Sequence, residues 1–159
     1  MSLMATLQRG ENVTLSDGTV LEGPLRRPGR KLVILGDTYD PSPITSIAED
    51  AHILIHEATN AYLPGIDPGT KSSDIFEVVE ERTKSRGHST PQMAGLFGKR
   101  IRARKLILNH FSARYAGNDD VDERAGEVMT AIRSLAQREF GGEVLCARDL
   151  MTVDVALDE

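Results

Sequence analysis

Three short apolar runs constrain the fold of this chain more than any other feature of its sequence. They occupy residues 31–36, 53–55 and 106–108. Each run is too short for a helix and is rich in Leu, Ile and Val, so each is predicted to be a buried β-strand. Between and after these runs, apolar residues recur at helical spacing. This order predicts an α/β domain with helices packed on a largely buried sheet.

The remaining elements follow from periodicity and from turn residues. Three helices are predicted from one-sided apolar stripes: residues 74–84, 90–101 and 121–140. A hairpin and two short final strands are also predicted: residues 12–23, 143–147 and 151–155. Thr90-Pro91 is a strong helix start, Asp119-Asp120 supplies negative charge before the last helix, and Gly141 ends that helix.

Length and composition limit the classes of protein that this chain can be. Its 159 residues, 40% hydrophobic, suffice for one domain, expected over residues 12–159 after an irregular leader over residues 1–11. No apolar stretch approaches the ~18–20 residues of a membrane helix. The single cysteine, Cys146, excludes an internal disulfide and a multi-cysteine zinc site, and it fits a reducing, intracellular compartment. The net charge of −5 argues against a broad basic surface for nucleic acid.

Side chains that can bind metal or move protons stand at the ends of the apolar runs. Asp37 follows the first run, His56-Glu57 follows the second and His110 follows the third. Because the carboxyl ends of strands in an α/β sheet converge on one crevice, three such coincidences indicate a site. His88 precedes a predicted helix start, where unpaired backbone N–H groups favour an anion.

Each of these residues also has an ordinary structural interpretation. Asp37 could cap a turn, Glu57 could be a solvated loop carboxylate and His88 could be a surface residue before a helix. For His56, a hydrogen-bonded position at the edge of the core is the better interpretation. Arg114 could be an exposed basic residue beside a packing aromatic. Only the whole set, taken in order, separates these interpretations from a functional one.

Four short motifs occur in a fixed order along the chain. They are Gly-Asp-Thr at residues 36–38, His-Glu-Ala-Thr at 56–59, Gly-His-Ser-Thr at 87–90 and Asn-His-Phe-Ser-Ala-Arg-Tyr at 109–115. Together they resemble the C-terminal half of ribonuclease Z (tRNase Z), the tRNA 3′ endonuclease family of the metallo-β-lactamase superfamily. The resemblance covers nearly the whole chain. It implies one half of an αββα sandwich, with a mixed sheet and helices packed on it.

The resemblance implies a role for each matching residue. Asp37 would bridge two zinc ions, and His110 would bind one of them. His88 would act at the scissile phosphate as general acid or transition-state stabiliser, and Glu57 would set its tautomer and pKa. Three further residues would shape the pocket or contact RNA: Ser89, Thr90 and Arg114. The implied reaction is metal-assisted hydrolysis of precursor tRNA after the discriminator base, which leaves a 3′-hydroxyl.

One part of the family pattern is missing from this chain. The family takes most of its zinc ligands from a His-x-His-x-Asp-His motif and a further histidine, all upstream of Gly-Asp-Thr, whereas the first histidine here is His52. The arm that grips tRNA belongs to the same missing part. The expected partners are therefore precursor tRNA and either the N-terminal half or a second copy of this chain, with no membrane. The implied location is cytoplasmic, or nuclear or mitochondrial in a eukaryote.

Three functions remain open on the sequence alone. The first is a zinc-dependent endoribonuclease for the tRNA 3′ end, the second a metallo-β-lactamase-fold hydrolase of small esters or phosphodiesters, and the third a non-catalytic interaction half-domain. The motifs at residues 88–90 and 110–115 favour the first function over the second, because a bare metal site does not need them. For the first function, Asp37, His88 and His110 should converge within about 10 Å. The isolated chain should be inactive and should expose one apolar face of its sheet.

Overall fold

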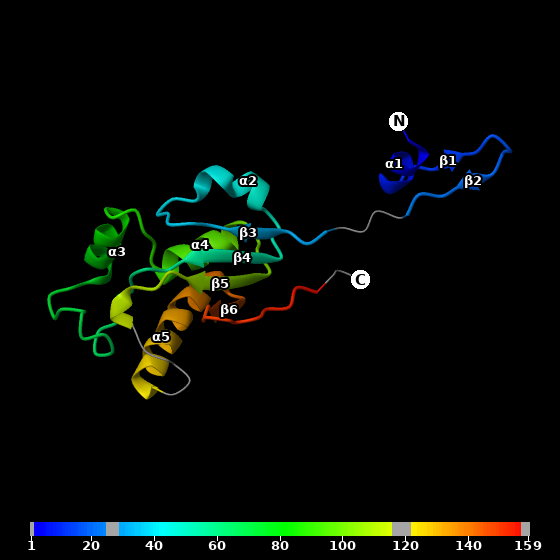
Figure 1. Ribbon diagram of the computed structural model, residues 1–159. Helices are drawn as coiled ribbons and strands as arrows, with labels where there is room; N and C mark the ends of the chain where they lie inside the picture. Colours follow the sequence, from blue (N-terminus) through cyan, green and yellow to red (C-terminus); the bar gives the residue numbers. More distant parts are fainter. Residues whose placement is uncertain (1, 25–28, 116–121, 157–159) are drawn as a thin grey trace. The chain divides into compact units, whose positions relative to one another are not determined.

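The computed structural model describes residues 2–24, 29–115 and 122–156. The chain divides into two compact units, Met1–Gly29 with Ala156–Glu159, and Arg30–Val155 (Figure 1). The expected single domain over residues 12–159, after a leader over residues 1–11, stays a prediction. All the candidate site residues belong to the larger unit. Among the described residues, no helix is long and apolar enough to cross a membrane.

The smaller unit contains one short helix and a two-stranded hairpin: α1 (Leu3–Gln8), β1 (Val13–Thr14) and β2 (Val20–Leu21). The strands pair antiparallel, and the turn between them contains Gly18 at φ 85°, a conformation that favours glycine. The hairpin predicted over residues 12–23 is confirmed. The expected irregular leader is instead partly helical, because the Ser2 hydroxyl caps α1 by accepting from the Ala5 N–H at 3.2 Å.

The larger unit is a parallel sheet with helices packed on it, which confirms the α/β fold class. Its four strands are hydrogen-bonded in sequence order: β3 (Leu32–Ile34), β4 (Ile53–Glu57), β5 (Lys105–Asn109) and β6 (Glu143–Cys146). All three strand pairs are parallel, so the described part of this sheet is not the mixed sheet that was expected, and the antiparallel hairpin forms a separate sheet. Over its described residues, the other elements are four α-helices and two 3-10 turns: η1 (Ser42–Ile44), α2 (Thr45–Ala48), α3 (Phe76–Lys84), α4 (Pro91–Arg100), η2 (Ala113–Tyr115) and α5 (Glu123–Phe140).

The helix ends follow the capping residues in the sequence. The Thr90 hydroxyl accepts from the Met93 N–H at 3.3 Å and so begins α4, with proline at its first position. The Asp122 carboxylate accepts two backbone N–H groups at the start of α5, and Gly141 ends that helix at φ 79°. The predicted charge at Asp119-Asp120 lies outside the described residues.

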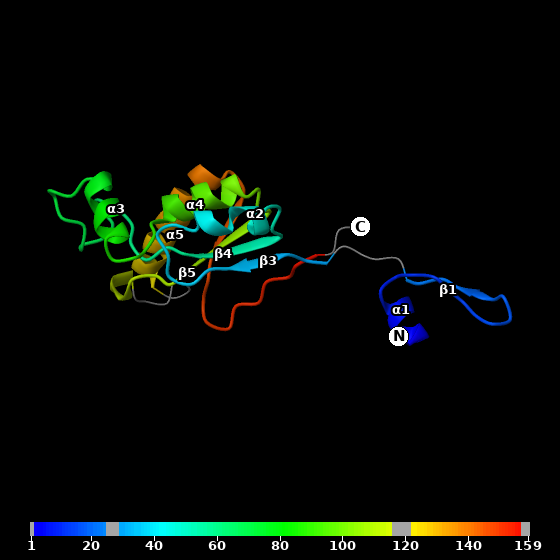
Figure 2. The same ribbon diagram turned by 90° about the horizontal axis from the view of Figure 1, so that it is seen from above.

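One face of the sheet carries the hydrophobic core. Figure 2 shows α2, α4 and α5 on this face. Because side chains alternate along a strand, Leu54, Leu106 and Leu108 all point toward these helices, and none of the three has exposed surface. Ile101 and Ile132 complete the contact from the helical side. Each such buried side chain stabilises the fold by about 1.5–3 kcal/mol.

The opposite face of the sheet is only partly covered. Ile34, Ile55 and Ile107 lie in register across it. Ile34 is 68% exposed and Leu32 is 53% exposed, so the expectation of a buried strand over residues 31–36 is wrong. The reason is position, because β3 is the edge strand of the sheet. Residues 151–155 form no strand, but Met151, Val153 and Val155 are partly buried in alternation with exposed neighbours.

Gly95 marks the closest approach of α4 and α5. A Cβ atom at this position would lie 2.4 Å from the Ala136 carbonyl oxygen and 3.0 Å from the Glu139 Cβ. Alanine gains about 1 kcal/mol of helix propensity over glycine, but overpacking costs about 1–3 kcal/mol. Because the atom met is backbone, the cost should exceed the gain, and we expect Gly95→Ala to lower the free energy of unfolding in urea by up to about 2 kcal/mol. Gly36→Ala is the control, since a Cβ there meets nothing within 4 Å. Equal stability of both variants would show that the helix contact can relax.

Candidate active site

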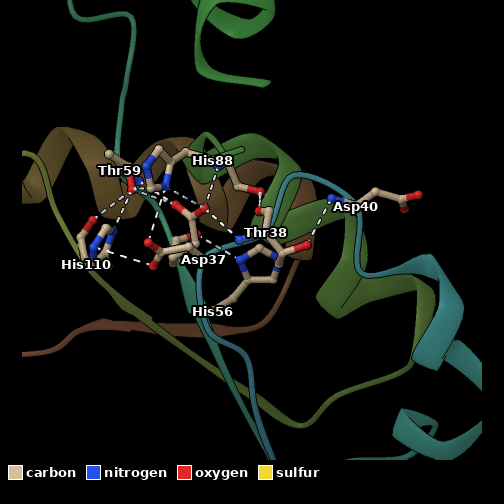
Figure 3. Close-up of polar contacts among 9 residues, drawn as sticks. Asp37, Thr38, Asp40, His56, Thr59, His88 and His110 are labelled. Atoms are coloured by element: carbon tan, nitrogen blue, oxygen red, sulfur yellow. Dashed lines mark hydrogen bonds and ion pairs between the residues drawn. The ribbon is translucent and has the colours of Figure 1, made fainter. Parts of the chain in front are cut away.

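Asp37, His88 and His110 meet at the carboxyl edge of the sheet (Figure 3). Asp37 follows β3, His110 follows β5, and His88 lies in the turn between α3 and α4. One donor atom from each of the three lies within 4.8 Å of the other two. Asp37 Oδ1 is 3.5 Å from His110 Nε2, and Asp37 Oδ2 is 4.0 Å from His88 Nδ1. The predicted convergence is confirmed, because neighbouring parallel strands bring their carboxyl ends to one edge.

Glu57 is the buried carboxylate behind this cluster, and it is 1% exposed. Its Oε1 atom accepts from the backbone N–H groups of Thr38 at 3.1 Å and Ser89 at 2.9 Å, and it lies 3.3 Å from His88 Nδ1. Its Oε2 atom accepts from the Thr59 N–H at 3.1 Å and from the Thr59 hydroxyl at 2.7 Å. Burial of a carboxylate is costly unless it is fully hydrogen-bonded, and here donors from three loops converge on it. Glu57 therefore holds together the segments that carry Asp37 and His88.

His110 has an unusual backbone conformation at the end of β5. Its φ is 53°, in the left-handed region that residues other than glycine rarely occupy. Strain of this kind persists where the surrounding structure fixes it, often at a functional site. The ring stacks on that of His88, with centroids 5.3 Å apart and planes 24° apart. The side chains of His110 and Asp37 are about half exposed, so an ion or a substrate can reach them.

Two of the three residues expected to shape the pocket or contact RNA are fully buried. Ser89 and Thr90 have no exposed surface. The Ser89 hydroxyl donates to the Thr38 carbonyl at 2.6 Å, and the Thr90 hydroxyl caps α4. Their burial leaves these two side chains no surface for direct contact with RNA.

Arg114 is held within the loop that follows β5. Its Nε donates to Asp67 Oδ2 at 2.9 Å, and its guanidinium lies 4.7 Å from the centre of the Tyr115 ring. The Tyr115 hydroxyl in turn contacts the Ala61 N–H at 2.9 Å. This network connects the segments after β4 and β5. Arg114 is 37% exposed, so part of the guanidinium remains accessible.

Thr59 is a site residue that the sequence reasoning missed. Its Oγ1 lies 2.7 Å from Glu57 Oε2, 2.9 Å from His110 Nδ1 and 3.3 Å from His88 Nδ1 (Figure 3). Its position two residues after Glu57 could have indicated a place in the site, because residues two apart in an extended segment point to the same side.

His56 faces the core instead of the site. Its side chain has no exposed surface, and its Nδ1–H donates to the Glu57 carbonyl at 2.8 Å. Its Nε2 has no hydrogen-bond partner within the part of the chain that the structure describes. Its ring lies edge-on to Phe97, with centroids 6.1 Å apart. The interpretation as a hydrogen-bonded histidine at the core is confirmed. Burial lowers the pKa of the His56 imidazole below its ordinary value.

This lowered pKa predicts a pH dependence of stability. The unfolded chain takes up a proton at His56 near pH 6.5, before the folded chain does. The free energy of unfolding should therefore fall as the pH drops below that value, with a slope approaching about 1.4 kcal/mol per pH unit. His56→Asn should remove this contribution in urea denaturation measured across the pH series. Identical slopes for the variant and the parent chain would contradict the assignment.

Curated proteins similar to this chain are named ribonuclease Z or ribonuclease BN. No family model matches the chain. Ribonuclease Z of Natronomonas pharaonis is 37% identical over 153 residues, which cover 94% of this chain and 42% of that protein. Ribonuclease Z of Brevibacillus brevis is 36% identical over 157 residues, covering 96% and 43%. The chain is homologous to ribonuclease Z. It spans less than half the length of these curated relatives.

Solved structures agree with the homology to ribonuclease Z. The short form of human tRNase Z (ELAC1) matches with a TM-score of 0.51 and 31% identity, covering 87% of this chain and 37% of that one. The metallo-β-lactamase fold protein YhfI from Bacillus subtilis matches with a TM-score of 0.50 and 21% identity, covering 81% and 39%. The second match shows a shared fold. The resemblance that the four motifs indicated is thus confirmed.

Proposed function

We propose that this chain is the part of a zinc-dependent endoribonuclease that carries its general acid and some of its metal ligands, and that the whole protein matures the 3′ end of precursor tRNA. The observation that carries the proposal is the cluster of Asp37, His88 and His110, with Glu57 buried behind it, in a chain homologous to ribonuclease Z.

The donor atoms of Asp37 and His110 suit a zinc ion. Two ligands at about 2.0–2.1 Å from a tetrahedral zinc lie roughly 3.3 Å apart. Asp37 Oδ1 and His110 Nε2 are 3.5 Å apart, and carboxylate oxygen with imidazole nitrogen is a donor pair that zinc accepts. A catalytic zinc needs about three protein ligands, so further ligands would come from outside this chain. A bound ion would supply an activated water and positive charge for the phosphate.

In this proposal His88 transfers a proton to the leaving oxygen of the substrate, and its contacts support that role. Its Nδ1 lies 3.3 Å from Glu57 Oε1 and 4.0 Å from Asp37 Oδ2. A carboxylate only accepts hydrogen bonds, so Nδ1 carries a proton that faces Glu57. To act as an acid, the ring would carry a second proton on Nε2, and this is the proton that the leaving oxygen would receive. The His88 side chain is 21% exposed. Its neighbours therefore restrict the orientation of the ring, but a substrate can still reach it. Geometry of this kind suits a general acid.

The burial of Glu57 argues against a non-catalytic half-domain. A carboxylate that is 1% exposed is retained at the cost of desolvation, and its hydrogen bonds orient His88 and Thr59 at an exposed edge of the sheet. The backbone contacts of Glu57 would serve a structural module equally well, so the contact with the partly exposed His88 ring is what favours a catalytic role.

The partly covered face of the sheet is the proposed contact for the missing N-terminal half. Ile34 is 68% exposed on this face. Ile34→Asp should change the free energy of unfolding by no more than about 0.5 kcal/mol, yet it should prevent association with that half by placing a charge in an apolar interface. Ile47→Asp is the matched control, because Ile47 is 72% exposed on α2, on the helical side. Sedimentation of the mixture checks both variants, and normal association of Ile34→Asp would place the interface elsewhere.

Substrate preference separates the proposed endoribonuclease from a small-molecule hydrolase. The chain would be combined with the N-terminal half of the Brevibacillus brevis ribonuclease Z and given either precursor tRNA or a nitrophenyl phosphodiester. We expect cleavage of the precursor at the discriminator base, with a 3′-hydroxyl on the product. Hydrolysis of the small diester without cleavage of precursor tRNA would instead support a hydrolase of small substrates.

A further inference from the structure

We infer that Thr59 fixes the tautomer of His110, so that Nε2 is the atom of this ring that binds metal. The inference rests on the proposed function for its purpose, but the tautomer itself is a property of this chain. Thr59 would thus be a positioning residue, one that acts on the metal through His110.

The hydrogen-bond donors and acceptors around Thr59 leave one consistent arrangement. A hydroxyl has a single proton, and the shortest contact of Thr59 Oγ1 is to Glu57 Oε2 at 2.7 Å. Since a carboxylate only accepts, the Thr59 O–H donates to Glu57. The lone pairs of Oγ1 then face His110 Nδ1 at 2.9 Å, so that nitrogen must carry the ring's proton. His110 Nε2 is left with its lone pair on the side of Asp37, 3.5 Å from Oδ1.

The competing acceptors for the Thr59 proton are weaker. His88 Nδ1 lies 3.3 Å from Oγ1, but it already carries a proton that faces Glu57 Oε1. The His110 carbonyl lies 3.1 Å from Oγ1, farther than the carboxylate and without its charge. Hydrogen bonds to an ionised acceptor are shorter and stronger than those between neutral groups. The 2.7 Å contact to a carboxylate that is 1% exposed therefore decides the direction of the hydroxyl.

One carboxylate thereby controls both histidines of the site. Glu57 Oε1 contacts His88 Nδ1 directly at 3.3 Å, whereas Glu57 Oε2 acts on His110 through the Thr59 hydroxyl. Both rings then hold their proton on Nδ1 and present Nε2. Outer partners of this kind commonly fix the orientation of metal-binding histidines, and their loss typically weakens metal binding 10–100-fold.

The backbone of Thr59 is held independently of its hydroxyl. Its N–H donates to Glu57 Oε2 at 3.1 Å, and its carbonyl accepts from the Ser112 N–H at 3.0 Å. Thr59→Val keeps the branched shape but removes the hydroxyl, and these two main-chain bonds remain available to it. Thr59→Ser keeps the hydroxyl and is the matched control.

The test is the tautomer of His110 in the metal-free chain labelled with ¹⁵N-histidine, measured by long-range ¹H–¹⁵N spectra at a pH where the imidazoles are neutral. His110→Asn identifies the signals. We expect the Nδ1–H tautomer in the parent chain and in Thr59→Ser, and a shift toward Nε2–H in Thr59→Val. The parent spectrum alone overturns the inference if His110 holds its proton on Nε2. An unchanged tautomer in a folded Thr59→Val also overturns it.

Metal affinity of the chain combined with the Brevibacillus brevis N-terminal half provides a second measurement. Thr59→Val should weaken zinc binding about 10–100-fold, and Thr59→Ser should leave it near the parent value. Equal zinc affinity of the two variants would show that the Thr59 hydroxyl does not support zinc binding by His110. If the tautomer shifts as expected but the combined protein does not cleave precursor tRNA, the proposed function fails and the tautomer assignment stands.

Discussion

His88→Ala in the protein reconstituted with the N-terminal half is expected to retain zinc while losing most cleavage of precursor tRNA. Loss of a positioned acid–base group typically lowers the rate about 10²–10⁴-fold. His88 Nδ1 is directed at Glu57 at 3.3 Å and lies farther, at 4.0 Å, from Asp37 Oδ2, which favours proton transfer over metal binding. Single-turnover cleavage and metal analysis of the same sample measure the two effects together.

The position of His88 is also compatible with a role as a metal ligand. His88 belongs to the group of three side chains whose donor atoms lie within 4.8 Å of one another, so it could serve as a ligand. Equal zinc loss in His88→Ala and His110→Ala would show that His88 binds metal. His52→Ala is the control, because His52 lies just before β4, at the opposite end of that strand from the site. It should preserve both zinc and cleavage.

Substitution of Asp37 or His110 should remove metal and activity together. Asp37→Asn keeps the shape of the side chain but removes the charge that would face the metal, and His110→Ala removes the nitrogen donor. Because changes to outer partners already weaken metal binding up to about 100-fold, loss of a direct ligand should weaken zinc binding by at least that factor. Zinc titration followed by cleavage at saturating zinc separates the two effects. Full zinc affinity in Asp37→Asn would show that another residue provides the bridging ligand.

Much of the site could be predicted from the sequence because it depends on local rules. Short apolar runs became the parallel strands β3, β4 and β5, and polar residues directly after parallel strands necessarily share one edge of the sheet. Asp37 and His110 were found in this way. The start of α4 at Thr90-Pro91 was equally local, since the cap depends on a hydroxyl and a proline in sequence.

The parts that were not predicted depend on tertiary contacts. An apolar run has the same pattern in an edge strand as in a central one, so the exposure of Ile34 could not be read from residues 31–36. Ser89 and Thr90 are polar residues in a turn, and their full burial depends on tertiary contacts, such as that of the Ser89 N–H with Glu57. The link from Thr59 to His110 joins two loops that are distant in the sequence, so no spacing rule reveals it.

Zinc content and cleavage, measured on the chain alone and after addition of the N-terminal half, test the central claim most directly. Among the residues that the structure describes, Asp37 and His110 are the proposed ligands, and a catalytic zinc requires about three from protein. The chain alone should therefore hold no stoichiometric pair of zinc ions and should not cleave precursor tRNA. Addition of the N-terminal half should restore zinc uptake and cleavage together. Two tightly bound zinc ions per isolated chain, with activity, would contradict this account.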